Sequence, residues 1–383
     1  MGRHRRTNRK SLQICPQQKV KRIAVICETW FPYLGGGQTN AYEISKRIAG
    51  KKYAMDIITR NCGRDQLPTP KNLRIIKLGR KQDPLNLFSK IMFLLRSGIY
   101  IYKSDYDLVH AHAFLPGITA RIISVFKGTP SVFTVHGTSL NSGLNHKFKE
   151  LLEKWILTGI LYDTQITVSR DFYNFKNVNK KIVFIANGVN AKRVNNKNHR
   201  GQSLLFVGRL HKQKNVATLF EALPAIMDKF PGVVLTVIGE GAEKEKLKDL
   251  CAKLKLSKHV KFWGNIENDK LAKYYQAAAL LVLPSIYEGE PLVLLEAWAN
   301  KLPVVATATG DCPFLVKEGH NGFLIKDPLN ASEIARVVTK ALGVVNLSKL
   351  GQNGYNFVYK NFTWAISAKQ TKDVYQNLLK AKN

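Results

Sequence analysis

The chain has 383 residues, of which 45% are hydrophobic and 22% are charged. This composition excludes an intrinsically disordered chain, and the length exceeds what one hydrophobic core usually serves, so we expect two domains. The formal net charge is +32, and residues 1–198 hold 34 Lys and Arg against 11 Asp and Glu. A field of this sign attracts polyanions, and charge alone does not choose between nucleic acid and an anionic lipid surface.

The five cysteines are odd in number and include no C-x-x-C pair, which argues against a disulfide framework and against a zinc site. No run of 18 or more apolar residues occurs, and the first 22 residues lack the apolar core of a secretion signal. We therefore expect a cytoplasmic protein that is neither exported nor membrane-spanning.

The first part of the chain predicts a basic arm followed by an α/β domain. Residues 1–22 carry eight basic residues and no acidic one, which predicts a mobile arm. Short apolar runs follow, with helical patterns between them, at residues 22–27, 55–59, 108–112, 132–136 and 165–169. Buried parallel strands have this pattern, so we expect an α/β domain over residues 23–195.

The segment 85–103 has apolar residues at helical spacing, with Lys90, Arg96 and Lys103 among them. A buried helix of the first domain explains this pattern, and so does a helix that exposes an apolar face to lipid. The sequence leaves both alternatives open.

The second part of the chain repeats the alternation of strands and helices. A polar, asparagine-rich stretch near 188–202 predicts a linker. Strand candidates then follow at residues 203–208, 233–239, 260–264, 280–284 and 303–307, which predicts a second α/β domain over residues 196–365. Doubly wound parallel sheets bind ligands at the carboxyl ends of their strands, so we expect the site between the two domains.

The segment 285–299 carries the most specific pattern. It follows a strand candidate and contains Glu288 and Glu296, which can bracket a polyhydroxyl ligand because ionised carboxylates accept hydrogen bonds from hydroxyl groups. Pro291 suits the first turn of a helix, whose free N–H groups favour a phosphate.

This segment resembles a motif of the retaining glycosyltransferases of family 4. The resemblance extends to Val207-Gly208-Arg209-Leu210-x3-Lys214-Asn215, to His136-Gly137 and to Asn187-Gly188-Val189, and it covers almost the whole chain after the arm. It implies the GT-B fold, which consists of two doubly wound Rossmann-like domains that face a cleft. It also implies that a final helix, 366–383, crosses back to the first domain.

The resemblance implies roles for individual residues. Arg209 and Lys214 would hold the donor pyrophosphate in place of a metal, so no metal or other cofactor is expected. Glu288 would bind the donor sugar and Glu296 the ribose. Backbone groups of Gly289, Pro291 and Leu292 are expected near the sugar and phosphate, and Gly36 and Gly37 of the glycine triplet are expected against the phosphates. His136 is expected near the sugar. His110 and His112 are further candidates on the acceptor side.

The expected function is retaining transfer of a hexose from a UDP- or GDP-linked sugar to a glycan or lipid-linked acceptor of the cell envelope. The enzyme would be peripheral at the anionic inner face of the plasma membrane. A 2-epimerase with the same fold is the alternative enzyme, and a basic protein that binds nucleic acid or membranes is the alternative from another class. Gly137 stands where many relatives have Asp after the histidine, so acceptor contacts cannot be transferred from them. Asn190 stands where family members have Asp, so contacts near the hinge between the domains cannot be transferred either.

Overall fold

The computed structural model describes residues 19–30, 35–63, 67–81, 87–136, 147–170, 179–190, 201–289 and 291–382. Most of the predicted arm, most of the linker and Gly137 therefore lie outside the described residues. The first strand begins at Lys21, two residues before the predicted start of the domain.

The N-terminal domain is built on seven parallel strands in the order β3-β2-β1-β4-β5-β6-β7. Their bounds are β1 Lys21–Cys27, β2 Tyr53–Arg60, β3 Leu73–Leu78, β4 Leu108–His112, β5 Ser131–Val135, β6 Thr164–Thr167 and β7 Ile182–Phe184. The central strands are buried on both faces, because helices cover the sheet on each side.

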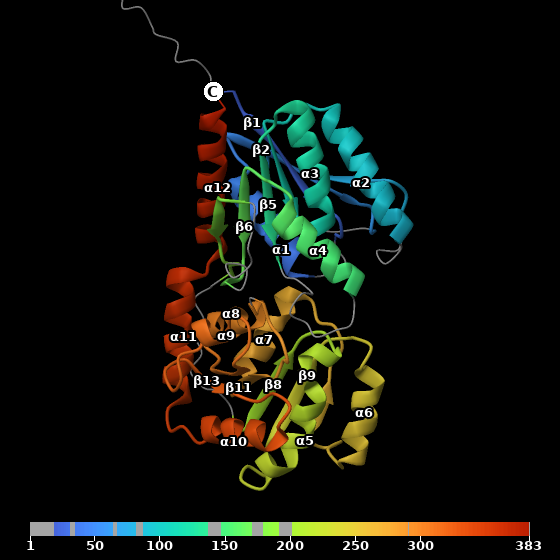
Figure 1. Cartoon of the computed structure of the whole chain (residues 1–383). Helices are drawn as coiled ribbons and strands as arrows, with labels where there is room; N and C mark the ends of the chain where they lie inside the picture. The colour runs from blue at the N-terminus through green and yellow to red at the C-terminus, as the bar shows by residue number, and fades with distance from the viewer. Residues whose placement is uncertain are drawn as a thin grey trace, which may run out of the picture.

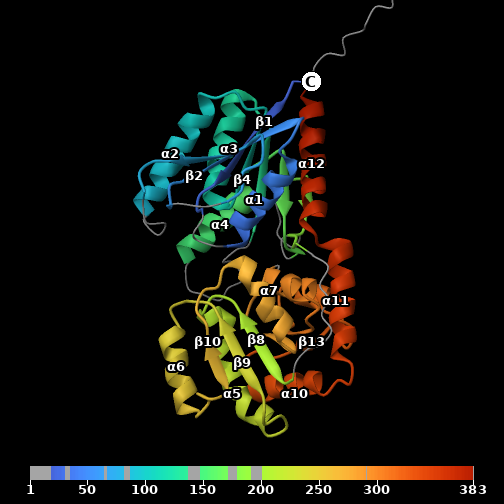
Figure 2. The same cartoon turned by 180° about the vertical axis from the view of Figure 1, so that it is seen from behind.

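Helices cover the two faces of this sheet in two groups, as Figures 1 and 2 show. One core contains residues of α1 (Gly36–Ile48) and α12 (Trp364–Ala381). The opposite core contains residues of α2 (Leu87–Tyr102), α3 (Phe114–Lys127) and α4 (Lys147–Gly159). No described helix is both long enough and apolar enough to cross a bilayer.

The C-terminal domain has six parallel strands in the order β10-β9-β8-β11-β12-β13. Their bounds are β8 Ser203–Val207, β9 Val234–Ile238, β10 Val260–Phe262, β11 Leu280–Leu283, β12 Val304–Thr307 and β13 Gly322–Ile325. The helices are α5 Val216–Met227, α6 Lys244–Lys253, α7 Asn268–Ala277, α8 Leu292–Ala299, α9 Cys312–Leu315, α10 Ala331–Leu342 and α11 Leu347–Asn361, with a 3-10 turn at Lys212–Lys214.

The two domains are joined twice. Thr363 ends the C-terminal domain and forms a bridge with Val189, whose N–H donates to the carbonyl of Phe362 at 2.9 Å. The last helix, α12, then packs against α1 of the N-terminal domain, and Trp364 and Tyr375 are buried in that domain's core. The last helix of the chain therefore belongs to the N-terminal core.

Candidate functional site

The carboxyl ends of the two sheets face each other across the domain boundary (Figure 1). Across this boundary the N–H of Arg170 donates to Asp311 at 3.1 Å, and the Arg170 guanidinium lies 5.1 Å from the centre of the Phe314 ring. Gly36 also lies near Leu292, because a methyl group placed on Gly36 would lie 3.5 Å from Cδ1 of Leu292. Gly36 and Leu292 were both predicted to flank the donor, and the structure brings them together. The contact between Arg170 and Asp311 was not predicted, because it joins residues 141 positions apart.

Lys214 and Glu288 form an ion pair at the end of the C-terminal sheet. Nζ of Lys214 lies 2.5 Å from Oε1 of Glu288, and the two side chains are 18% and 8% exposed. An ion pair this enclosed is poorly screened by solvent. The two residues predicted to contact phosphate and sugar are therefore bound to each other.

The turn that carries Lys214 is fixed to the loop that carries Glu288. Asn215 has a left-handed backbone (φ 54°), and its side-chain amide donates to the carbonyls of Pro284 and Pro328 at 3.2 and 2.6 Å. Gln213 donates from Nε2 to the carbonyl of Tyr287 at 2.9 Å. These contacts hold the cation beside the carboxylate, and the Asn that follows Lys214 is the only sequence signal for them.

Arg209 lies just after β8 and has an exposed side chain. Its guanidinium has no ion pair or hydrogen bond with any described residue. The backbone beside it is tightly held: a methyl group on Gly239 (φ 141°) would lie only 1.9 Å from the carbonyl oxygen of Gly208. Arg209 thus presents a cation from a rigid segment.

The Glu288 loop rests on the turn from Thr309 to Asp311. The N–H of Asp311 donates to the carbonyl of Gly289 at 3.2 Å, and a methyl group on Gly310 (φ 53°) would lie 1.5 Å from the carbonyl oxygen of Glu288. Only glycine fits at 310, for reasons of both space and backbone conformation. Gly289 itself has open space beside it.

Helix α8 begins one residue later than the sequence predicted. Pro291 is its N-cap and Leu292 its first residue, whereas Pro291 was expected inside the first turn. No side chain caps the N–H groups of the first turn in the described part of the chain, and the N–H of Leu294 donates to the carbonyl of Pro291 at 3.0 Å. Glu290 lies outside the described residues.

Glu296 projects from α8 and accepts a hydrogen bond from the hydroxyl of Tyr275 at 2.7 Å. Burial raises the pKa of the Glu296 carboxyl, and the Tyr275 hydrogen bond acts in the opposite direction. Tyr275 is buried and holds one oxygen of the carboxylate in place. Sequence reasoning missed Tyr275, since nothing near it in the chain indicates this contact.

Three histidines gather at the ends of β4 and β5. Nδ1 of His112 lies 2.8 Å from Nε2 of His136, and His110 contacts the hydroxyls of Tyr375 and Thr134, both at 2.6 Å. Burial lowers the pKa of His136 to about 4 and that of His110 to about 3, and the pKa of His112 is also far below its usual value. The three rings are therefore neutral at pH 7.

His136 also lies beneath the glycine triplet. A methyl group on Gly37 would come within 3.2 Å of its Cδ2 atom. Its Nδ1 atom is buried and has no hydrogen-bond partner among the described residues. His110 and His112 are almost fully buried and bonded within the fold, and their place on the acceptor side stays a prediction.

Comparisons with known proteins agree with this architecture. Residues 34–193 match the family described as Glycosyltransferase Family 4, and residues 189–356 match that described as Glycosyl transferases group 1. An uncharacterised glycosyltransferase of Methanocaldococcus jannaschii is 28% identical over 387 residues, which cover 93% of this chain and 98% of the relative. This chain belongs to glycosyltransferase family 4.

Solved structures show the same fold as this family 4 glycosyltransferase. Sucrose-phosphate synthase from Thermosynechococcus elongatus superposes with a TM-score of 0.83 at 25% identity, over 94% of this chain and all of that one. HepE of Anabaena, in complex with UDP-glucose, superposes with a TM-score of 0.77 at 17% identity, over 93% of this chain and 99% of that one. The predicted GT-B fold is confirmed, and membership of the family makes the donor a nucleotide sugar.

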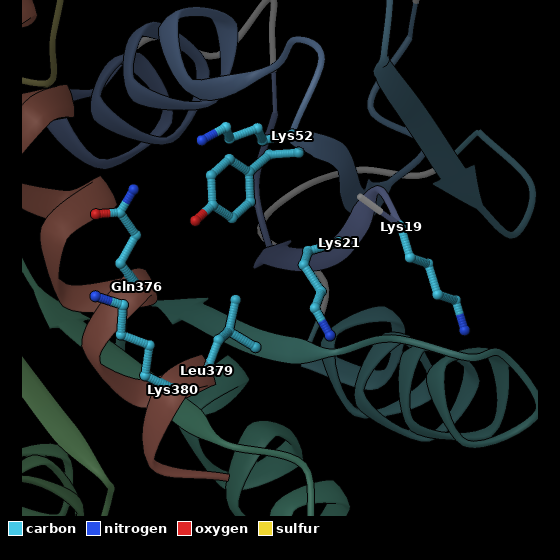
Figure 3. A pocket seen from close by; sticks show the side chains of 7 residues that line it. Lys19, Lys21, Lys52, Gln376, Leu379 and Lys380 are labelled. Carbon is cyan, nitrogen blue, oxygen red and sulfur yellow. The ribbon is translucent and has the colours of Figure 1, made fainter. Parts of the chain in front are cut away.

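A second basic site on the glycosyltransferase lies at the other end of the N-terminal sheet. Figure 3 shows a hollow lined by Lys19, Lys21, Lys52 and Lys380, beside Gln376 and Leu379. It lies where β1 and β2 begin and α12 ends, whereas Arg209 and Glu288 follow the carboxyl ends of strands. Lys21 is paired with Asp107 at 3.0 Å, and the hollow is separate from the candidate donor site.

Proposed function

We propose that this enzyme transfers a hexose, with retention of configuration, from a UDP- or GDP-linked sugar to a hydroxyl group of a glycan or lipid-linked acceptor. The observation that carries the proposal is the ion pair between Lys214 and Glu288, which lies beyond the carboxyl ends of strands of the C-terminal sheet. Arg209 follows β8 of the same sheet, and Glu296 lies on α8, which begins shortly after Glu288. Two cations, two carboxylates and free N–H groups match the phosphates and hydroxyls of such a donor.

The ion pair between Lys214 and Glu288 suggests how the site accepts its donor. An arriving pyrophosphate competes with the Glu288 carboxylate for Lys214, because both are anionic oxygen ligands for one ammonium group. Release of Lys214 leaves Glu288 free to accept hydrogen bonds from sugar hydroxyls. Arg209, which has no such partner among the described residues, makes the first phosphate contact in this scheme.

The remaining residues complete the donor site in the proposal. Glu296, held by Tyr275, binds the ribose hydroxyls. Gly36 and Gly37 pass close to the phosphates, since a side chain there would meet Leu292 or His136. His136 is proposed to lie near the sugar, because its buried Nδ1 has no hydrogen-bond partner among the described residues and a neutral ring can donate or accept a hydrogen bond.

The proposed chemistry needs no covalent intermediate on the protein. The acceptor oxygen bonds to the anomeric carbon on the face from which the diphosphate leaves, and the acceptor proton passes to a phosphate oxygen. Arg209 and Lys214 stabilise the negative charge that develops on the leaving diphosphate. The site is proposed to work in the cytoplasm.

A donor panel tests this function. Release of UDP or GDP from their glucose, galactose, N-acetylglucosamine and mannose conjugates is measured with membrane lipid extract and oligosaccharides as acceptors, and the product anomer is read by NMR. HepE binds UDP-glucose, so UDP conjugates are tested first. A glycoside that keeps the donor's anomeric configuration is expected. A free epimerised nucleotide sugar would instead favour the 2-epimerase alternative.

A further inference from the structure

Helix α2 carries an exposed apolar stripe along its whole length. Its exposed large side chains follow one another at spacings of three and four, which places them on one side of the helix: Phe88, Ile91, Leu95, Ile99 and Tyr102. Phe93 and Ile101 are buried on the opposite side, against the sheet. The sequence left open whether this helix is buried or exposes an apolar face. In the structure one side of the helix is buried against the sheet, and the other side exposes the apolar stripe.

The two neighbouring helices continue this exposed surface. In α3, Ile122, Val125 and Phe126 are exposed, and Phe126 is 75% exposed, whereas Ile123 is buried. In α4, Leu151 and Trp155 lie one turn apart, opposite the buried Ile156. We call the combined exposed side of α2, α3 and α4 the outer face.

The outer face is continuous between α2 and α3. Nζ of Lys127, the last residue of α3, donates to the carbonyls of Tyr102 and Ser104 at 2.9 and 2.7 Å and lies over the Tyr102 ring. Figure 1 shows the three helices together on one side of the N-terminal sheet. Ten of the eighteen large hydrophobic side chains exposed in the described part of the chain lie here. Soluble proteins scatter such residues singly, and a patch of this kind marks an interaction surface.

Charge identifies the partner. Helices α2 and α3 contain no acidic residue, and their basic residues are Lys90, Arg96, Arg121 and Lys127, with Lys103 directly after α2. Lys90 is paired with Glu28 at 3.9 Å, so Arg96, Arg121 and Lys103 are the cations offered to headgroups. Helix α4 carries Glu150 and the buried Glu153 beside Lys154, so the basic part of the outer face is its α2 and α3 side. A second copy of the chain would bring the same cations against one another. An anionic lipid surface meets both requirements, because apolar side chains insert at the acyl boundary while cations contact the headgroups.

We propose that the outer face binds reversibly to the surface of an anionic lipid bilayer. Because α2, α3 and α4 each begin beyond the carboxyl end of a strand, this contact places the bilayer beside the domain boundary where donor and acceptor meet. The proposal specifies the lipid-linked alternative for the acceptor, and it does not depend on the donor assignment, since it is tested without either substrate.

The binding experiment is flotation of the full chain with vesicles of phosphatidylcholine alone or mixed with phosphatidylglycerol. Binding is expected only to the anionic vesicles, and it should weaken as salt is raised. The Leu95→Gln and Phe126→Gln double variant should lower the partition coefficient at least about tenfold. Arg96→Gln and Lys103→Gln should each lower it about fivefold. The control double variant, Leu329→Gln with Tyr359→Gln, changes exposed residues of the C-terminal domain and should bind as the wild type does.

Two tryptophans provide a matched test of orientation. Trp155 on the outer face and Trp263 in the C-terminal domain are 54% and 53% exposed. Brominated lipids in the anionic vesicles should quench part of the tryptophan fluorescence, and this quenching should disappear in Trp155→Phe and persist in Trp263→Phe.

Each of the following results would overturn the proposal: equal binding to neutral and anionic vesicles, full binding by the outer-face double variant, or quenching that depends on Trp263. Sedimentation showing a wild-type dimer that the double variant abolishes would assign the outer face to self-association instead. UDP affinity is measured on the same variants, so failure of the membrane proposal is distinguishable from failure of the proposed donor site.

Discussion

Lys214 and Glu288 form an ion pair in which each charge stabilises the other. Glu288 is almost completely buried, and Lys214 is the cation within ion-pair distance of it among the described residues. A buried carboxylate deprived of its partner destabilises the fold, because the carboxylate has also lost its solvation by water. In the proposed donor site, the same two residues are therefore expected to affect both the stability of the fold and donor binding.

Lys214→Gln is expected to lower the free energy of unfolding by about 1–3 kcal/mol, since it leaves the Glu288 carboxylate without a cation. Lys212→Gln is the matched control, because Lys212 lies in the same 3-10 turn and is exposed; it should change stability by less than about 0.5 kcal/mol. Urea unfolding measures both. Equal effects of the two substitutions on the free energy of unfolding would show that the ion pair does not stabilise the fold.

Glu296→Gln should separate donor binding from stability. The amide oxygen can still accept the Tyr275 hydroxyl, so we expect stability to change by less than about 0.5 kcal/mol. Loss of the charged acceptor should weaken UDP binding about tenfold or more. Calorimetric titration with UDP measures this, with Glu245→Gln on exposed α6 as the control. An unchanged affinity would remove Glu296 from the ribose site.

Among the elements, the turn from Thr309 to Asp311 controls where the Glu288 loop lies. Its Gly310 and the distant Gly319 have similar left-handed conformations (φ 53° and 69°), but only Gly310 touches another segment. Substituting each of the two glycines therefore separates the free-energy cost of contact with the Glu288 loop from the cost of the left-handed backbone conformation.

Gly319→Ala should lower stability by about 1 kcal/mol, the usual cost of a left-handed conformation for a residue with Cβ. Gly310→Ala should lower it by a further 1–3 kcal/mol, roughly, and should also weaken UDP binding, because its methyl group displaces the Glu288 backbone. Unfolding and titration are measured on both variants. Similar results for the two would mean that the turn does not support the loop.

The histidines of β4 and β5 make stability depend on pH. Their pKa values are lower in the folded state than the ordinary 6.5, so the unfolded chain binds more protons and stability falls as pH drops below 6.5, down to about 4 for His136 and about 3 for His110. Each should contribute a loss of about 1.4 kcal/mol at pH 5.5 relative to pH 7.5. His136→Asn should remove its share of this loss. A wild type equally stable at both pH values would contradict neutral burial.

Local patterns predicted most strands, and the misses have physical reasons. The buried apolar runs of β1, β2 and β4 were recognisable, but β3 and β7 are partly exposed sheet-edge strands and β13 is a short run after a glycine. Arg209, Lys214, Glu288 and Glu296 were identifiable because each lies in a contiguous motif. Tyr275 and Asp311 act through folding contacts with distant segments, and no local pattern marks them.

At the scale of the whole molecule, the chain divides its tasks between two domains. The C-terminal domain carries the charged donor candidates, and the N-terminal domain carries most of the positive charge, the histidines of β4 and β5 and the outer face. Helix α12 and the bridge between Val189 and Thr363 join the two, so the carboxyl ends of both sheets remain opposed.

The assignment of the donor site is tested most directly by calorimetric titration of the wild type and Arg209→Ala with UDP at low salt. Arg209 is exposed and unpartnered among the described residues, so its removal should leave stability unchanged. We expect wild-type binding that weakens about 10- to 100-fold in Arg209→Ala, the loss of one charged hydrogen-bonding group. If UDP does not bind, titration with GDP shows whether the site accepts guanine as the nucleotide base. Equal affinity of wild type and variant for the nucleotide that binds would contradict the assignment of the donor site.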